Sequence, residues 1–203
     1  MSTQVTTGLE KAWHTLGELD PATVCKNTGA THNPETGDYT LISLGTNIII
    51  DPARKVIEAE RPEDTARLRK LGYFTDHAIL WYMVSAKDIG LARKLVKPNS
   101  LKGGHHFFTG THELPLGVIA GKYGASREAF VARAVELGGK SIRYGDAGVE
   151  LYPLPRIPIT VILWLSDDEF PARADLLFDS SCELHVALDI NWSVAMYTLL
   201  SML

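Results

Sequence analysis

Residues 75–86, "TDHAILWYMVSA", decide how the rest of this chain must be arranged. The stretch predicts a helix that begins at a cap formed by Thr75 or Asp76 and is apolar on nearly every side. A helix without a polar face is stable only where other elements cover it all round. We therefore expect this helix at the centre of the core, with the remaining segments packed around it.

β-rich segments lie on both sides of this central helix. Residues 39–43 and 47–50 flank Gly45-Thr46 and predict a hairpin, and residues 147–151 and 157–165 predict two antiparallel strands joined through "PLPRIP". We expect these strands to form one antiparallel sheet that packs against the central helix and a second helix at 126–137. Trp81 and Trp164 should then be mostly buried.

Cap signals place further helices along the chain. Thr7 and Glu10 have the spacing of a capping box, Asp20-Pro21 begins a short helix that ends near Gly29, and Asp189 caps the last helix. The helices, the antiparallel strands and the absence of internal repeats predict an α+β fold. We expect a single domain over residues 1–203, in which an antiparallel sheet packs against several helices.

The composition excludes several classes of protein. A net charge of −4 without a basic run argues against a nucleic-acid partner. The two cysteines, Cys25 and Cys182, are too few for an all-cysteine metal site and fit a reduced cytoplasm. The N-terminus resembles no signal peptide, and no apolar window has the ~20 residues of a membrane helix. We expect a cytoplasmic protein with no membrane partner.

The stretch "LKGGHHFFTGTHELP", residues 101–115, gathers three histidines, His105, His106 and His112. Neutral imidazole is a common ligand of transition metals and an axial ligand of haem and corrinoids, so these histidines are candidate cofactor ligands. Their spacing matches no established zinc motif. The alternative is a glycine-hinged loop whose histidines bind backbone groups or face solvent.

The phenylalanines that follow predict how this loop is anchored. Gly103-Gly104 should form a bend, and an extended strand beyond it would bury either Phe107 or Phe108. If Phe107 points inward, His105 shares its face and His106 is left available. This geometry favours axial ligation of a planar cofactor, with His112 as a second ligand, over a three-histidine metal cage.

Three carboxylates, Asp167, Asp168 and Glu169, follow the second predicted strand. With His112 and Glu113 they would make a divalent metal site, in which bound water is the nucleophile of a hydrolase or transferase. That site requires two segments some fifty residues apart to meet. The alternative is an ordinary acidic turn at a strand end.

Two other groups are weaker candidates. Arg156, between two prolines, suits a carboxylate or phosphate of a cofactor, and an ion pair with a buried partner such as Asp179 is the structural alternative. Cys182 and His185 have helical spacing for a nucleophile and base, although a buried structural cysteine is the commoner role.

The C-terminal half resembles the family catalogued as domain of unknown function 3786. The shared signals, in order, are Gly-Asp at 145–146, Pro-Arg-Ile-Pro at 155–158, a strand ending in Trp164, Asp-Glu-Phe-Pro at 168–171 and Leu-Phe-Asp at 177–179. "AILWYMVSA" and the Gly-Gly before Phe107 extend the resemblance to most of the chain. The resemblance implies an origin in anaerobic bacteria or archaea and relatives fused to an iron–sulfur domain of the kind found in corrinoid proteins. It implies no functional residue.

The favoured hypothesis is therefore a cytoplasmic cofactor- or metal-binding accessory protein of anaerobic metabolism. Its expected ligand is a corrinoid, haem or other tetrapyrrole, and its expected partner is a corrinoid or iron–sulfur protein. The alternatives are the metal-dependent hydrolase or transferase and an interaction module without a ligand. The sequence leaves open whether the protein is an enzyme.

Overall fold

The computed structural model describes residues 8–203 and confirms an α+β fold, but with two antiparallel sheets where one was expected. The four-stranded sheet follows the chain in the order β1-β2-β3-β4, and the five-stranded sheet has the order β5-β9-β8-β7-β6. The strands are β1 (Thr31–His32), β2 (Tyr39–Ser43), β3 (Thr46–Asp51), β4 (Val56–Ala59), β5 (Leu95–Val96), β6 (Lys140–Ile142), β7 (Ala147–Leu154), β8 (Ile157–Trp164) and β9 (Arg173–Asp179).

The helices occur where the periodicity predicted them, with additional short ones. They are α1 (Gly8–Glu18), α2 (Pro21–Thr28), α3 (Pro62–Leu71), α4 (Tyr73–Ser85), α5 (Gly104–Phe107), α6 (Leu116–Tyr123), α7 (Arg127–Glu136), α8 (Cys182–His185) and α9 (Leu188–Met202). Single 3₁₀ turns, η1 (Pro98–Ser100) and η2 (Gly110–His112), lie on either side of α5.

The predicted helix caps are confirmed in part. The Asp20 carboxylate accepts a hydrogen bond from the backbone N–H of Thr23 at 2.9 Å, and α2 ends at Gly29 with φ of 78°. Ala187 occupies the N-cap of α9, so Asp189 lies in the first turn and does not cap it. Thr7 of the predicted capping box lies outside the described residues.

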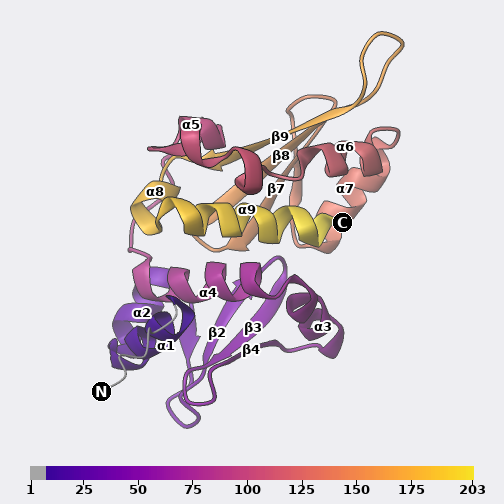
Figure 1. Cartoon of the computed structure of the whole chain (residues 1–203). Helices are drawn as coiled ribbons and strands as arrows, with labels where there is room; N and C mark the ends of the chain where they lie inside the picture. The colour runs from indigo at the N-terminus through magenta and orange to yellow at the C-terminus, as the bar shows by residue number, and fades with distance from the viewer. Residues whose placement is uncertain (1–7) are drawn as a thin grey trace.

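Helices α4 and α9 form the centre of the molecule. Figure 1 shows them side by side, α4 over the four-stranded sheet and α9 over the five-stranded sheet. Both helices are buried on most sides, and the buried apolar residues of both halves form one continuous cluster. The central position expected for 75–86 is therefore confirmed, but the expected cap is wrong, because α4 begins at Tyr73 with Gly72 at its N-cap and neither Thr75 nor Asp76 caps it. Because each of the two helices needs cover on its far side, the predicted strands divide between two sheets.

Two tyrosine hydroxyls inside this core have hydrogen-bond partners. The Tyr82 hydroxyl donates to the carbonyl oxygen of Thr28 at 2.7 Å, which ties α4 to α2. The hydroxyls of Tyr197 and Ser43 are 2.8 Å apart, and Ser43 donates to the carbonyl oxygen of Pro153 at 2.6 Å. This chain of hydrogen bonds joins α9 to one strand of each sheet, since an unpaired polar group here would cost about 1–3 kcal/mol.

The two predicted core tryptophans lie at the margin of the core. Trp81 is partly buried and packs against the central cluster. Trp164 is partly buried on the five-stranded sheet, where the Arg173 guanidinium lies 4.4 Å from its ring centroid. Both indoles therefore border the core without being enclosed by it.

A pair of glycines brings the backbones of the two halves into close contact. Gly45, in the β2–β3 turn, and Gly138, after α7, have φ of 73° and 70°. A Cβ on Gly138 would lie 2.6 Å from the Gly45 Cα, and one on Gly45 would lie 2.8 Å from the Gly138 nitrogen. Neither position accepts a side chain, because the backbones themselves are in contact.

We predict that Gly138→Ala lowers the free energy of unfolding by about 2–4 kcal/mol, through a left-handed alanine and a clash with backbone. Gly121→Ala is the matched control, since Gly121 lies inside α6 facing open space and alanine there should stabilise by up to about 1 kcal/mol. Urea denaturation of both variants measures the difference. Equal effects of the two substitutions would contradict the close approach.

Candidate functional site

The histidine segment forms one helical turn, so the extended strand expected after the Gly103-Gly104 bend is wrong. Gly103 adopts φ of 80° and precedes α5, and a Cβ on Gly104 would lie 2.1 Å from the carbonyl oxygen of Pro98. The backbone N–H of Lys102 donates to the Glu183 carboxylate at 2.6 Å. The predicted glycine bend is present, and it starts a helix because the chain turns back tightly against η1.

Phe108 anchors this turn to the core, which confirms that one of the two phenylalanines is buried; it is not Phe107, the case from which a single available imidazole was expected. Phe108 is buried and Phe107 is half-buried, since successive helical residues point about 100° apart and do not alternate between two faces. His105 and His106 are both exposed, with ring centroids 5.2 Å apart, and neither imidazole makes a hydrogen bond or ion pair within residues 8–203. The turn therefore presents two imidazoles to solvent.

His112 belongs to an aromatic wall beside these imidazoles, which we define as Phe74, Phe107, His112 and Trp192. The His112 ring stacks on Phe107 at 4.3 Å between centroids and meets Trp192 edge-on at 4.8 Å. Phe74 meets Trp192 at 5.3 Å, which joins the wall to α4. Trp192 Nε1 is buried without a partner in the described chain. These contacts orient His112 through its ring faces.

The acidic turn lies far from the histidines. Asp167, Asp168 and Glu169 are exposed in the β8–β9 loop, which projects from one end of the sheet in Figure 1. The α5 turn packs near α8, beyond the other end of β9, and a seven-residue strand spans roughly 20 Å. His112 and Glu113 precede α6, whose length of about 12 Å separates them from the loop.

The structure thus does not bring the proposed metal ligands together. Within residues 8–203, no group of three or more His, Cys, Asp or Glu side chains is arranged to hold a metal ion. Asp167 accepts hydrogen bonds from the backbone N–H groups of Glu169 and Phe170, at 2.9 and 2.7 Å. These bonds lower the pKa of Asp167 and account for it as a turn-forming residue.

Arg156 forms a structural link whose acidic partner is Asp88, where the sequence suggested Asp179. Its guanidinium donates to the Asp88 carboxylate at 2.7 Å and to the carbonyl oxygens of Lys26 and Ile89 at 2.8 and 3.0 Å. The Arg156 guanidinium thereby joins the C-terminal part of α2 to the segment that follows α4. Asp179 accepts instead from Ala92 and Ser181. Arg156 has little capacity left for a cofactor anion.

Cys182 and His185 share helix α8 but do not form a catalytic pair. Burial raises the pKa of the Cys182 thiol to about 12, so the thiolate is absent at neutral pH. His185 Nδ1 accepts from the backbone N–H of Lys87 at 3.3 Å, and Nε2 is buried without a partner in the described residues. The geometry favours a structural role for both side chains over a nucleophile and a base.

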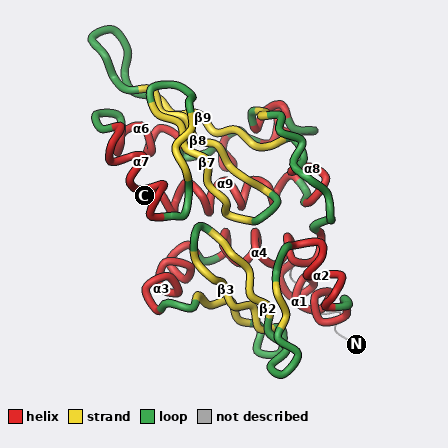
Figure 2. Tube along the Cα trace, turned by 180° about the vertical axis from the view of Figure 1, so that it is seen from behind, coloured by secondary structure: helices red, strands yellow, loops and turns green. Residues whose placement is uncertain are grey.

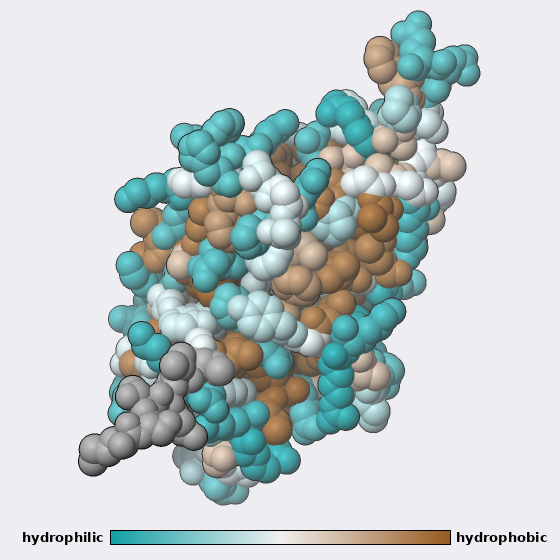
Figure 3. Space-filling view, viewed as in Figure 1, coloured by the Kyte–Doolittle hydropathy of each residue, from teal (hydrophilic) through white to brown (hydrophobic). Residues whose placement is uncertain are grey.

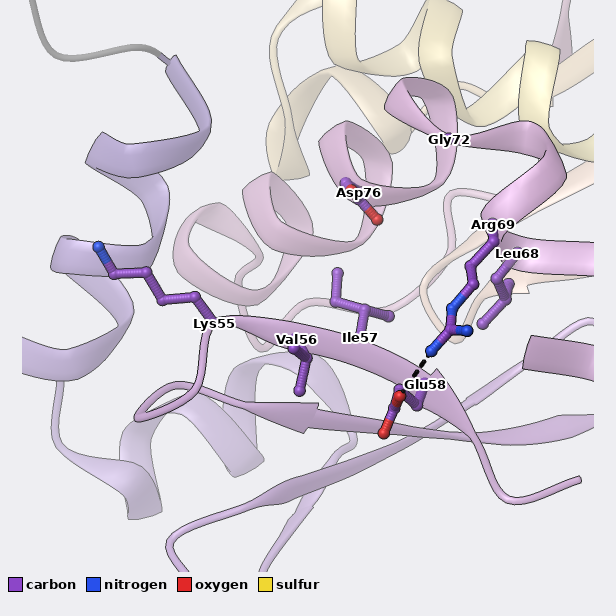
Figure 4. A pocket seen from close by; sticks show the side chains of 8 residues that line it. All are labelled: Lys55, Val56, Ile57, Glu58, Leu68, Arg69, Gly72 and Asp76. Carbon is purple, nitrogen blue, oxygen red and sulfur yellow. Dashed lines mark hydrogen bonds and ion pairs between the residues drawn. The ribbon is translucent and has the colours of Figure 1, made fainter. Parts of the chain in front are cut away.

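A cleft between β4 and helices α3 and α4 contains a carboxyl group that the sequence suggested only as a helix cap. Figure 4 shows Asp76 pointing into this cleft of about 290 Å³ above Ile57, with Arg69 and Glu58 paired at 2.9 Å across its side. Burial raises the pKa of Asp76, and its carboxyl makes no hydrogen bond within residues 8–203. The sequence did not mark Asp76 as a candidate site residue, because aspartate is common in the first turn of a helix.

Comparisons with known proteins yield one match. A family model described as a domain of unknown function (DUF3786) matches residues 20–200 of the chain. The chain matches no curated protein and no solved structure. In the part of the chain that the structure describes, no helix has the length and apolar character needed to cross a membrane.

We predict that iodoacetamide at pH 8 labels Cys25 in the native protein and leaves Cys182 unmodified. Cys25 is partly exposed, whereas Cys182 is fully buried with a raised pKa, so its alkylation should be at least about a hundredfold slower. Mass spectrometry of the intact protein, with Cys25→Ser as the control, measures this. Rapid labelling of native Cys25→Ser would restore Cys182 as a candidate nucleophile.

The buried imidazole of His185 predicts a loss of stability in mild acid. Burial lowers its folded-state pKa, aided by Arg156 and Lys87, so below the ordinary histidine pKa of about 6.5 the unfolded chain binds a proton that the folded chain refuses. The free energy of unfolding should fall on the order of 1 kcal/mol from pH 7 to 5 through this group.

His185→Asn keeps an acceptor for the Lys87 N–H and should flatten this pH dependence, as measured by denaturation at several pH values. His14→Asn is the control, because His14 is exposed on α1, where it pairs with Glu18. An unchanged slope in His185→Asn would show that another group accounts for the acid sensitivity.

Proposed function

The chain belongs to the family described as domain of unknown function DUF3786, and we propose that it is a cytoplasmic accessory protein that binds a planar, metal-centred cofactor. The ligand we favour is a tetrapyrrole, either a corrinoid or haem, ligated by one imidazole of the α5 turn. The observation that carries this proposal is the exposed, unpartnered pair His105 and His106 on a rigidly held turn.

Three features of the turn support axial ligation. Gly103 and Gly104 fix its entry and Phe108 anchors its end, so an imidazole loses little freedom on binding a metal. The aromatic wall lies directly beside it and provides apolar surface for a flat macrocycle. The histidines do not converge on one point with a third ligand, which disfavours a closed ion cage and leaves single-imidazole ligation.

An accessory role fits better than catalysis in this part of the molecule. The Cys182 thiol is protonated and buried, and the acidic turn lies beyond the far end of the sheet. A surface imidazole that is open to solvent suits a cofactor carried by, or passed to, another protein. A corrinoid or iron–sulfur protein is the partner we propose.

We predict that haem or aquocobalamin added to the protein shows shifted visible absorption bands, as an imidazole replaces a weaker axial ligand. His105→Ala combined with His106→Ala should abolish the shift. His14→Ala, which removes an exposed histidine of α1, should leave it unchanged. Absorption titration and the dissociation constants from it measure the effect.

The His112→Ala variant tests whether His112 ligates the cofactor metal or only packs beside the cofactor. Since His112 is held by ring stacking, its loss should weaken cofactor binding several-fold while the band positions remain those of an imidazole complex. An unchanged spectrum of the wild-type protein with every tetrapyrrole tested would refute the proposal. A shift that survives in the His105→Ala, His106→Ala double variant would assign ligation to another residue.

A further inference from the structure

A second cleft lies on the face of the five-stranded sheet that carries no helix. Figure 2 shows strands β7, β8 and β9 from this side, with α9 behind them. The cleft has a volume of about 400 Å³ and its polar lining comprises Arg93, Lys140, Tyr144, Glu150, Tyr152, Thr160 and Asp179. These residues come from both edges and the middle of the sheet, so only the folded chain assembles them.

Side chains along each strand point alternately to the two faces of the sheet, and this alternation forms the face without helices. Val149 and Leu151 point toward the helices and are fully buried, whereas Glu150 and Tyr152 point to the opposite side and remain partly exposed. Thr160, opposite Glu150 on β8, is 3% exposed and makes no side-chain hydrogen bond within residues 8–203. The floor of the cleft therefore contains a hydroxyl that is free to bind a ligand.

A hydrogen-bonded group occupies one side of the cleft. Lys140 Nζ lies 2.9 Å from Glu150 Oε1, and the Tyr152 hydroxyl donates to the same oxygen at 2.8 Å. The Lys140 ammonium also lies 5.7 Å from the Tyr152 ring centroid. Glu150 is thus neutralised within the protein and holds both partners in place.

The other side of the cleft carries a cation, Arg93, that makes no ion pair within residues 8–203. Arg93 adopts φ of 56°, an uncommon conformation for a residue with a side chain. Asp179 beside it accepts from the backbone N–H groups of Ala92 and Ser181 at 2.9 and 3.0 Å. These bonds all reach Oδ1 of Asp179, and no ion pair joins Asp179 to Arg93 within residues 8–203, so the Arg93 guanidinium is available to a ligand.

Apolar groups complete the cleft. Leu91 and Leu95 line it on the Arg93 side and Tyr144 on the Lys140 side, and these large side chains are 38%, 36% and 49% exposed. Exposed apolar surface next to a cation without an ion pair and a free hydroxyl is the usual make-up of a small-molecule site. The volume is also within the range of such sites.

We propose that this sheet-face cleft binds a flat organic anion with a single carboxylate, sulfonate or phosphate group. Arg93 binds the anionic group, Thr160 offers a hydrogen bond at the floor, and Leu91, Leu95 and Tyr144 cover the apolar part. The site is independent of the α5 turn, since none of its lining residues comes from that turn or from the aromatic wall.

The test uses 8-anilinonaphthalene-1-sulfonate, a flat aromatic anion whose fluorescence rises in an apolar site. The full-length protein should bind it with a saturable increase in emission. Arg93→Gln should weaken binding about tenfold, the effect of removing one charged hydrogen-bond partner. Lys94→Gln is the matched control, because Lys94 is the neighbouring exposed cation and does not line the cleft.

A neutral analogue, N-phenyl-1-naphthylamine, lacks the sulfonate and so measures how much the negative charge of the probe contributes to binding. Arg93→Gln should leave its affinity unchanged, whereas Tyr144→Ala should weaken the binding of both probes. Equal weakening of the anionic probe by Arg93→Gln and Lys94→Gln would indicate general surface electrostatics and overturn the proposal. Absence of saturable binding to the wild-type protein would overturn it too, as would tighter binding of a fluorescent single-stranded oligonucleotide than of the small anion.

Discussion

The packing of α4 against α9 is the constraint on which the rest of the structure depends. Neither helix has a polar face, so each must be covered by its neighbour on one side and by a sheet on the other. Tyr82 and Tyr197 bring hydroxyls into this interior, and their hydrogen bonds to α2 and β2 satisfy them. One chain thereby builds two sheets around a shared helical centre.

The candidate sites lie where this double-layered core meets its margins. The α5 turn is fixed from beneath by Phe108 and at its start by glycines, which leaves the imidazoles of His105 and His106 outside. The sheet-face cleft exists because the helices cover only one side of the five-stranded sheet. In both places a well-packed layer positions polar side chains that form no hydrogen bond or ion pair with the rest of the described chain.

Hydrogen bonds and ion pairs distinguish the polar side chains that stabilise the fold from those that are available to a ligand. Arg156, Glu150 and Asp179 each form hydrogen bonds or ion pairs with neighbouring groups of the fold. His105, His106, Asp76 and Arg93 have no such partners within the described chain, and each of them borders open space. A polar group that the fold leaves unsatisfied at a cleft is where a ligand gains most.

The sequence by itself determined the α+β class, the central helix, the β2–β3 hairpin and the helix caps that depend on local chemistry, as at Asp20 and Gly29. These features follow from periodicity and from hydrogen bonds between residues close in the chain. Tertiary structure alone decided that the strands form two sheets, that residues 104–107 are helical, and that Arg156 pairs with Asp88. It also assembled Lys140, Tyr152 and Arg93 into one cleft, because strand order and the contact of distant backbones depend on how whole layers pack.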